Sequence, residues 1–202
     1  MALTEDDVGH DPIPEVQRWL DDAVASDAVV EPFAMQVATA ADGRLTVRTV
    51  LLRGLDERGF MFVTNLESTK SRQLMASPAC ALTIVWTSLS RQVCATGRAE
   101  RVADDEVEAY WRTRPRGSRI GAWASPQSRV IADRATLERA VREIEERFAA
   151  TDDIPLPPFW GAWRIVPDTV ELWAGQPSRL HDRIRWRRSA PGAPWFRERL
   201  AP

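Results

Sequence analysis

The sequence predicts a mainly β protein whose antiparallel strands form a closed or split barrel with flanking helices at its edges. From Phe33 onward, apolar residues alternate with other residues at a period of two, and turn signals such as Asp42-Gly43 separate the runs. Only a few segments show the helical spacing of apolar residues instead. Eight or nine short strands joined mainly by hairpins leave exposed sheet edges, and closure into a barrel removes those edges.

The chain begins with an N-terminal tail and helix, residues 1–30, ahead of a single domain that we assign to residues 31–202. We expect the acidic start, residues 1–11, to be disordered. Residues 15–26 are predicted as a helix, because their apolar residues recur at i, i+3, i+4, i+7 and i+8. This spacing forms one stripe along the helix: Val16, Trp19, Leu20, Ala23 and Val24.

The first half of the domain reads as strands interrupted by one helix. Three strands, over 33–39, 45–53 and 60–64, are predicted as a meander because tight turns join them. Ser68 or Thr69 can cap a short helix over 70–76, which Ser77-Pro78 ends. Two more strands are expected over 80–87 and 91–102.

The second half mixes helices and strands. A short helix is predicted over 104–112, an irregular segment rich in Arg, Gly and Ser over 114–125, and a long helix from its cap Asp133 to Ala149. A Pro-rich link follows at 154–158. Three or four strands then complete the chain, over 159–166, 169–173, 184–188 and 195–199.

Composition narrows the classes of function. The net charge of -2 provides no basic field for a nucleic acid, and no apolar run is long enough to cross a bilayer. The N-terminus lacks the regions of a signal peptide, so a cytoplasmic protein is the expectation. Two separated cysteines and two isolated histidines predict neither a disulfide framework nor a metal site. The glycine-rich phosphate-binding motifs and the G-x-S-x-G motif of acyl transfer do not occur.

Basic side chains recur where the predicted strands end. Lys70 falls at the start of a helix, where backbone N–H groups favour an anion. It is the one lysine among 27 basic residues, so the other 26 are arginines (27 − 1 = 26). Arg48 and Arg53 lie five residues apart and point to opposite faces of their strand unless a bulge intervenes.

Four further clusters contain polar and aromatic residues, at 91–92, 110–118, 125–128 and 173–183. The last combines Trp173 with Arg179, His181 and Arg183, which suits a flat anionic ligand through stacking and forked hydrogen bonds. Each cluster alone is better explained as structural, for example as a helix cap or a solvated loop, than as functional. Together they predict one or two flat ligands that carry phosphate.

At these clusters the sequence resembles the pyridoxamine 5'-phosphate oxidase family, the flavin enzymes that make pyridoxal 5'-phosphate. The most specific stretches are R-P-R-G-S-R-I-G-A-W-A-S at 114–125 and R-L-H-D-R at 179–183. Other matching stretches are E-P-F-A-M-Q-V-A-T at 31–39, R-T-V-L-L-R at 48–53, T-N-L-E-S-T-K at 64–70 and R-L-A-P at 199–202. The resemblance covers residues 31–202.

The resemblance implies an FMN-binding split β-barrel of antiparallel, Greek-key-like topology and a homodimer with FMN at the subunit interface. It implies a cofactor site made by eight residues: Arg48, Thr64, Lys70, Gln92, Gln127, Ser128, Trp173 and Arg183. It implies a site for a phosphorylated pyridine substrate made by six: Arg53, Tyr110, Arg114, Ser118, Arg179 and His181. Of these, Arg179 and His181 would lie against the ring and are the predicted catalytic residues. The implied reaction is hydride transfer from the substrate's C4' carbon to the flavin, with O2 reduced to hydrogen peroxide.

Four features depart from the family's pattern. Arg53 stands where a lysine is usual, Val63 where an aromatic residue often lies beside the flavin, and Thr69 where a second basic residue is common. Residues 1–11 contain no arginine and no tyrosine, so they lack the Arg-x-x-Tyr segment that often closes over the substrate. We therefore expect weaker FMN binding and an altered closure of the substrate site.

Three functions remain open on the sequence. Oxidation of pyridoxamine or pyridoxine 5'-phosphate is favoured by the set Tyr110, Arg114 and Ser118. Oxidation of another reduced aromatic ring, as in relatives from phenazine natural-product biosynthesis, is favoured by Arg53 and by the missing closing segment. A non-catalytic flavin-binding protein is disfavoured, because both phosphate clusters are present.

Overall fold

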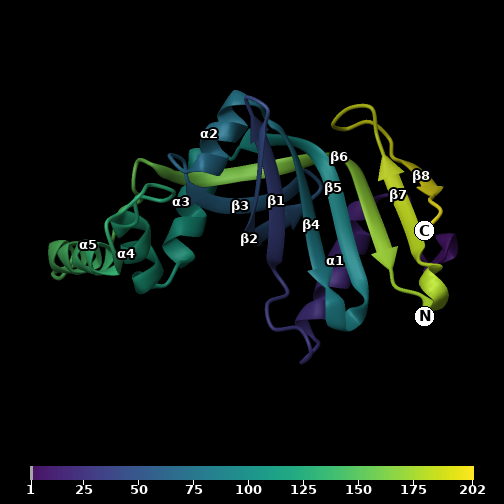
Figure 1. The fold of residues 1–202 in the computed structure, drawn as a ribbon, viewed down its shortest axis with the longest axis horizontal. Helices are drawn as coiled ribbons and strands as arrows, with labels where there is room; N and C mark the ends of the chain where they lie inside the picture. Colours follow the sequence, from purple (N-terminus) through teal and green to yellow (C-terminus); the bar gives the residue numbers. More distant parts are fainter. Residues whose placement is uncertain (1) are drawn as a thin grey trace.

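The computed structural model describes residues 2–202, which form one eight-stranded antiparallel sheet with five α-helices around it (Figure 1). The strands are β1 (Ala34–Ala41), β2 (Arg44–Asp56), β3 (Gly59–Asn65), β4 (Ala79–Trp86), β5 (Arg91–Arg101), β6 (Trp160–Ala174), β7 (Asp182–Arg187) and β8 (Phe196–Arg199). The helices are α1 (Pro12–Val24), α2 (Thr69–Ala76), α3 (Asp104–Thr113), α4 (Arg116–Ala124) and α5 (Arg134–Arg147).

Six of the strands close into a barrel. They follow the order β3-β2-β1-β4-β5-β6, and β3 also pairs with β6 from Phe60↔Ile165 to Asn65↔Trp160, which completes the ring. β4 lies beside β1 rather than beside β3, so β1 to β4 form a Greek key. β7 and β8 extend the sheet beyond β6. The predicted mainly β, antiparallel barrel with flanking helices is confirmed.

β6 is a single strand of 15 residues where the sequence predicts two. Pro167, which has no backbone N–H to donate, lies opposite Gly97 at a shift of register between β5 and β6. A Cβ atom on Gly97 would lie 2.1 Å from the carbonyl oxygen of Val166, so only glycine permits this approach. The first half of β6 pairs with β3 and the second half with β7, so the strand runs across the molecule (Figure 1).

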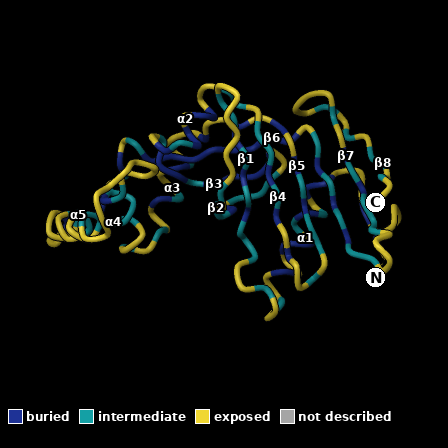
Figure 2. The backbone as a smooth tube through the Cα atoms, viewed as in Figure 1, coloured by how far each residue is buried: buried dark blue, intermediate teal, exposed yellow. Residues whose placement is uncertain are grey.

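The buried apolar side chains form two clusters, and the largely exposed helix α5 contributes no buried residue to either of them (Figure 2). The larger cluster fills the barrel, and α1 covers it with its apolar stripe; it includes Val16, Trp19, Phe60, Phe62, Ile84 and Trp186. The smaller cluster lies between the first half of β6 and α3 to α5; it includes Val107, Trp111, Ile120, Phe148 and Trp160. The second cluster therefore holds α3 and α4 against the barrel.

Residues 2–11 are ordered, so the disorder expected for residues 1–11 is wrong for this part, and Met1 lies outside the described residues. Leu3 and Val8 are 6% and 7% exposed and belong to the larger cluster. The backbone N–H of Leu3 donates to Asp182 at 3.0 Å, and Glu5 pairs with Arg199 at 2.8 Å. The acidic start is therefore held by charged residues from the far end of the sequence, a contact that no local pattern reveals.

Residues 116–124 form helix α4 where an irregular segment is predicted. Pro115 precedes the helix with its fixed φ, Ile120 belongs to the smaller cluster, and Ala122 and Trp123 pack against that cluster. Two predicted caps are confirmed: Ser68 accepts from the third residue of α2 and Asp133 from the third residue of α5.

The assigned boundary between residues 30 and 31 stays a prediction. None of the helices in residues 2–202 has the length and apolarity needed to cross a membrane.

Candidate functional site

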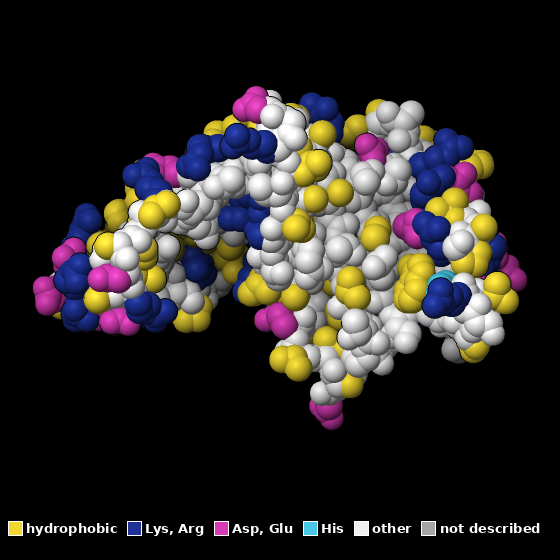
Figure 3. Space-filling view, viewed as in Figure 1, with side chains coloured by type: hydrophobic (Ala, Val, Ile, Leu, Met, Phe, Trp, Pro, Cys, Tyr) yellow, Lys and Arg dark blue, Asp and Glu magenta, His cyan; other side chains and the backbone are white. Residues whose placement is uncertain are grey.

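Five predicted cofactor residues line one cavity of about 420 Å³: Arg48, Thr64, Lys70, Gln127 and Ser128. They come from β2, from β3, from the start of α2 and from the turn after α4. Arg53 also lines this cavity, and its lining contains no carboxylate. We call it the basic pocket. Figure 3 shows basic side chains in the hollow between the barrel and the end of the molecule that α4 and α5 form.

Lys70 is buried in this pocket, 7% exposed, and its hydrogen-bond acceptors are all neutral. Its Nζ donates to Thr64 Oγ1 and to Gln127 Oε1, both at 2.9 Å, and to Ser68 Oγ at 3.3 Å. Burial, together with the nearby charge of Arg48, lowers the pKa of Lys70 to about 8. A buried ammonium group without an opposite charge is costly, and an anion in the pocket would compensate it.

The Arg48 guanidinium is likewise held by neutral groups. Its Nη1 donates to the carbonyl oxygen of Val37 and to Thr39 Oγ1, both at 2.8 Å, and its Nη2 donates to Thr46 Oγ1. Burial lowers the pKa of Arg48, but a guanidinium stays charged at any physiological pH. Two fixed cations without a carboxylate in the lining make the basic pocket suited to a phosphate group.

Arg53 lies at a β-bulge in β2. Leu52 pairs with Phe62, but Gly54 pairs with Met61, so Arg53 is the extra residue in the ladder. It lines the basic pocket together with Arg48 and also lines a neighbouring cavity of about 350 Å³. The strict alternation of a regular strand would separate the two arginines, and the bulge interrupts that alternation at Arg53.

Tyr110 lines this second cavity, and Arg114 lies one turn further along α3. The Arg114 guanidinium lies 4.6 Å from the ring centre of Trp160, and the ring of Tyr110 stacks on Trp160 at 6.3 Å. Arg114 Nη1 is buried without a hydrogen-bond partner within residues 2–202. Burial, and to a smaller extent Arg53, lower the pKa of Arg114.

An unpaired buried donor suits an anion, and the charge of Arg53 acts on Arg114, so these two arginines form a candidate second anion site beside the basic pocket. Arg53 lines both cavities and connects them. Ser118, predicted to belong to this site, is exposed on α4, and neither Ser118 nor Arg114 lines either cavity. Arg53 and Tyr110 line the second cavity together, and Arg114 lies over the same Trp160 ring on which Tyr110 stacks. The role of Ser118 stays a prediction.

Three more predicted cofactor residues form a row across the sheet. Gln92, Trp173 and Arg183 lie opposite one another on β5, β6 and β7, so their side chains share one face. Arg183 is held by Glu171 through two hydrogen bonds, of 2.7 Å and 3.1 Å. This forked pair fixes the plane of the guanidinium beside the indole.

The turn between β6 and β7 carries the two predicted catalytic residues. The ring of His181 lies 4.6 Å from that of Trp173, and its Nδ1 accepts from the backbone N–H of Gln176 at 3.1 Å. In the neutral ring the proton is therefore on Nε2, which can donate to a ligand. Arg179 is exposed, and both it and Ser178 have the left-handed φ values 62° and 58°. Such strain, on the order of 1–3 kcal/mol per residue, occurs where a backbone presents a side chain for function.

Within one chain, the predicted residues fall into two separated groups. Thr64 of the basic pocket pairs with Gly161 at the start of β6, whereas Trp173 lies 12 residues further along it (173 − 161 = 12). At roughly 3.3 Å per residue this is about 40 Å along the strand. The row of Gln92, Trp173 and Arg183 and the turn with Arg179 therefore lie at the opposite end of β6 from the basic pocket (Figure 1).

Residues 21–148 match the family model described as pyridoxamine 5'-phosphate oxidase, which is 128 of the 202 residues (148 − 21 + 1 = 128). The chain belongs to the pyridoxamine 5'-phosphate oxidase family. Residues 160–202 match a second model, described as the pyridoxine 5'-phosphate oxidase C-terminal dimerisation region. Trp173, Arg179, His181 and Arg183 all lie in this second match.

Relatives of this pyridoxamine 5'-phosphate oxidase family member are similar to it over its full length. A pyridoxine/pyridoxamine 5'-phosphate oxidase of Pseudomonas paraeruginosa is 52% identical over 100% of this chain and 93% of its own. One of Burkholderia lata is 49% identical over 100% of this chain and 94% of its own. Among solved structures, PhzG of Burkholderia lata, in complex with tetrahydrophenazine-1-carboxylic acid, has a TM-score of 0.90 at 31% identity over 100% and 98% of the two chains. A related FMN-binding protein of Nostoc punctiforme shares the fold, with a TM-score of 0.74 at 19% identity.

Three departures from the family's pattern lie in the basic pocket itself, because Arg53, Val63 and Thr69 all line it. Two further lining residues were missed on the sequence. Thr49 of β2 lines the basic pocket, and Gln17 of α1 lines the second cavity. Gln17 is a polar residue beside the apolar stripe of α1, and a polar residue on the surface of a helix does not by itself indicate a binding site.

Proposed function

We propose that the protein is an FMN-dependent oxidase that converts pyridoxamine or pyridoxine 5'-phosphate to pyridoxal 5'-phosphate and reduces O2 to hydrogen peroxide. The observation that carries the proposal is the pair of adjoining anion sites, the basic pocket and the Arg53–Arg114 site. The reaction involves two phosphate groups, one on the cofactor and one on the substrate. Two adjoining sites place both molecules side by side, as a transfer between them requires.

The residues of the basic pocket fit the phosphate of FMN, because the lining contains basic residues and no carboxylate. In our proposal Arg48 and Lys70 hold that phosphate, and Thr64, Gln127 and Ser128 complete its hydrogen bonds. FMN, when bound, supplies the hydride acceptor for the substrate's C4' carbon and the route of the electrons to O2. Arg53, Tyr110 and Arg114 hold the substrate's phosphate and so fix the pyridine ring.

We further propose a homodimer in which a second copy completes each site. The row of Gln92, Trp173 and Arg183 then meets the FMN bound by its partner, and Arg179 and His181 lie against the pyridine ring. The separation of the two groups along β6 and the match to a dimerisation region support this arrangement. Arg179 stays charged and therefore orients the substrate, whereas His181 donates a hydrogen bond from Nε2.

A second candidate is oxidation of a reduced aromatic acid, which the likeness to the PhzG structure supports. Two relatives from one organism weigh against it. The Burkholderia lata pyridoxine/pyridoxamine 5'-phosphate oxidase is 49% identical to this chain, and PhzG of the same organism is 31% identical over a similar length. The Arg53–Arg114 anion site also suits a phosphate ester.

The test is an assay of the purified protein for bound flavin and then for turnover in air. With pyridoxamine or pyridoxine 5'-phosphate, we expect pyridoxal 5'-phosphate and an equal amount of peroxide. A flavin-loaded protein that oxidises tetrahydrophenazine-1-carboxylic acid and neither phosphate ester would establish the second candidate instead. A flavin-loaded protein that oxidises none of them would leave a flavin-binding function without this chemistry.

A further inference from the structure

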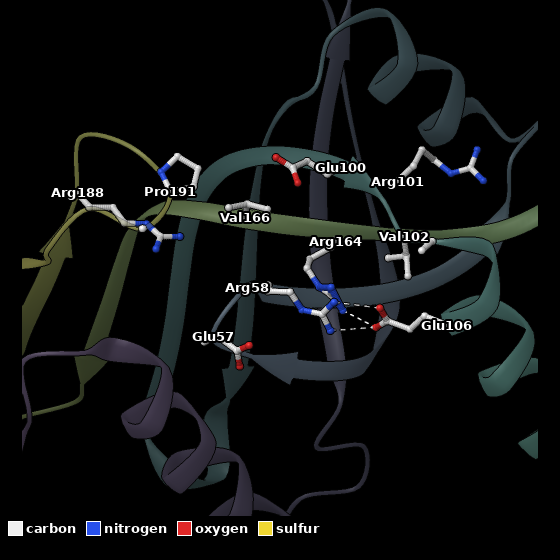
Figure 4. A pocket seen from close by; sticks show the side chains of 12 residues that line it. Glu57, Arg58, Glu100, Arg101, Val102, Glu106, Arg164, Val166, Arg188 and Pro191 are labelled. Carbon is white, nitrogen blue, oxygen red and sulfur yellow. Dashed lines mark hydrogen bonds and ion pairs between the residues drawn. The ribbon is translucent and has the colours of Figure 1, made fainter.

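Three charged residues that line a cavity of about 420 Å³, Arg58, Glu106 and Arg164, tie helix α3 to the barrel together with the neighbouring Asp56 (Figure 4 shows the three lining residues). Glu106, in the first turn of α3, pairs with Arg58 at 3.1 Å and with Arg164 at 2.6 Å. Arg164 extends from β6, is 7% exposed and also lies 3.5 Å from Asp56. Asp56 in turn pairs with Arg58 at 2.5 Å. We call these four residues the α3 clamp.

The α3 clamp joins the two elements that carry the second anion site. Glu106 and Tyr110 of α3 and Arg114, the residue that caps its C-terminus, follow one another at intervals of four residues, so they lie along one side of the helix. Asp56 ends β2 three residues after Arg53 (56 − 53 = 3). The clamp therefore fixes the start of α3 against the end of β2, and both elements then lead directly to a guanidinium of the anion site.

Apolar packing alone does not fix this geometry. The other face of α3 buries Val107 and Trp111 in the smaller cluster, but apolar contact has little directional preference. Charge-assisted hydrogen bonds set both a distance and a direction. Without Glu106, the buried Arg164 would keep one carboxylate, Asp56 at 3.5 Å, and its Nε already has no partner within residues 2–202.

We propose that the α3 clamp is a positioning device that sets the spacing of Arg53 and Arg114 around the phosphate of the substrate. The identity of that substrate rests on the function proposed above, but the anion site does not. The four residues contact each other rather than the ligand, so they act through Tyr110 and Arg114. Their loss should weaken capture of the phosphate and leave the chemical step and the FMN site unchanged.

The test compares Glu106→Gln with Glu108→Gln in FMN-loaded protein. Glu108 is the matched control, because it lies on the same helix and its one ion pair among residues 2–202 is with the exposed Arg112, at 2.5 Å. For Glu106→Gln we expect KM for the phosphate ester to rise about tenfold, with kcat within about twofold, which corresponds to roughly 1.4 kcal/mol of binding. Calorimetric titration with inorganic phosphate should show a similar loss, and Glu108→Gln should match the unmodified protein in both measurements.

Unchanged KM and unchanged phosphate affinity in Glu106→Gln would overturn the proposal. So would a joint loss of kcat, FMN retention and KM, because that pattern indicates general damage to the fold. If Glu106→Gln does not fold, Arg58→Gln takes its place, since Arg58 is 52% exposed and its removal spares Arg164–Glu106. It should raise KM and the phosphate Kd by about threefold, and no change in either would refute the clamp. The phosphate titration also remains decisive if neither phosphate ester is oxidised.

Discussion

Lys70→Met isolates the charge of the basic pocket from its packing. Methionine keeps the length and most of the apolar surface of lysine but removes the ammonium group. Thr64 and Gln127, which accept from Lys70, keep a hydrogen bond in the variant, because Thr64 Oγ1 already donates to Gln127 Oε1 at 2.9 Å. The folded apoprotein therefore loses a buried charge that has only neutral partners, and its melting temperature should stay the same or rise.

The affinity for FMN should change in the opposite direction. A hydrogen bond to a charged group contributes about 1.5–3 kcal/mol, and each 1.4 kcal/mol is about a factor of ten in Kd. Because Arg48 and Arg53 remain in the lining, the loss is limited to this one contact. We expect the Kd for FMN, measured by quenching of flavin fluorescence, to rise about 10- to 100-fold at pH 7.

The pH dependence provides an independent check. The pKa of Lys70 falls from 10.5 to about 8 on folding, so the unfolded chain binds more protons between these values. This group therefore makes the apoprotein more stable as the pH rises from about 8 toward 10.5. In the same window FMN binding weakens, because the neutral amine must first take up a proton to pair with the phosphate.

The control for these experiments is Arg72→Met, which removes an exposed cation from the same helix. Its FMN affinity should match that of the unmodified protein at every pH. If Lys70→Met binds FMN as tightly as the unmodified protein, or shows the same weakening above pH 8, Lys70 does not hold the phosphate. A large fall in the melting temperature of the Lys70→Met apoprotein would instead refute the reasoning about its buried charge.

Three further changes test other parts of the structure. Arg179→Ala should slow turnover about 100-fold and leave FMN bound, as followed by steady-state kinetics and flavin absorbance; unchanged turnover removes Arg179 from the site. Arg114→Met should raise KM for the phosphate ester about 10- to 100-fold while kcat changes little; an equal KM would contradict the second anion site. Gly97→Ala should lower the free energy of unfolding by about 3 kcal/mol or more in urea titrations, because its Cβ would meet the Val166 carbonyl oxygen at 2.1 Å; a stable variant would show that the strands can separate there.

The sequence predicts elements well where the signal is local. The strand periods, the Asp42-Gly43 turn and the caps at Ser68 and Asp133 all depend on neighbouring residues, and the structure contains them. Helix α4 was missed because Arg, Gly and Ser fill its exposed positions and leave few apolar residues to reveal its period. Its apolar face is visible only once the smaller cluster is known.

Features that depend on distant partners could not be predicted. The bulge at Arg53 arises from the pairing of β2 with β3, and the ordered start depends on contacts between Leu3 or Glu5 and residues near the other end of the chain. The candidate site divides in the same way. Residue types and motifs single out Lys70 and Arg179, but only the fold shows that they lie at opposite ends of β6.

That arrangement along β6 has a genetic consequence for the proposed dimer. Each site would combine the basic pocket of one copy with the row of Gln92, Trp173 and Arg183 and the turn with Arg179 of the other copy. A defect in Lys70 and a defect in Arg179 therefore damage different halves of a site. In a mixed dimer of two such defective chains, one site receives both defects and the other receives neither. Two inactive alleles carried together would therefore complement each other and restore up to about half of the sites in such mixed dimers, whereas two alleles altered in the same half would not.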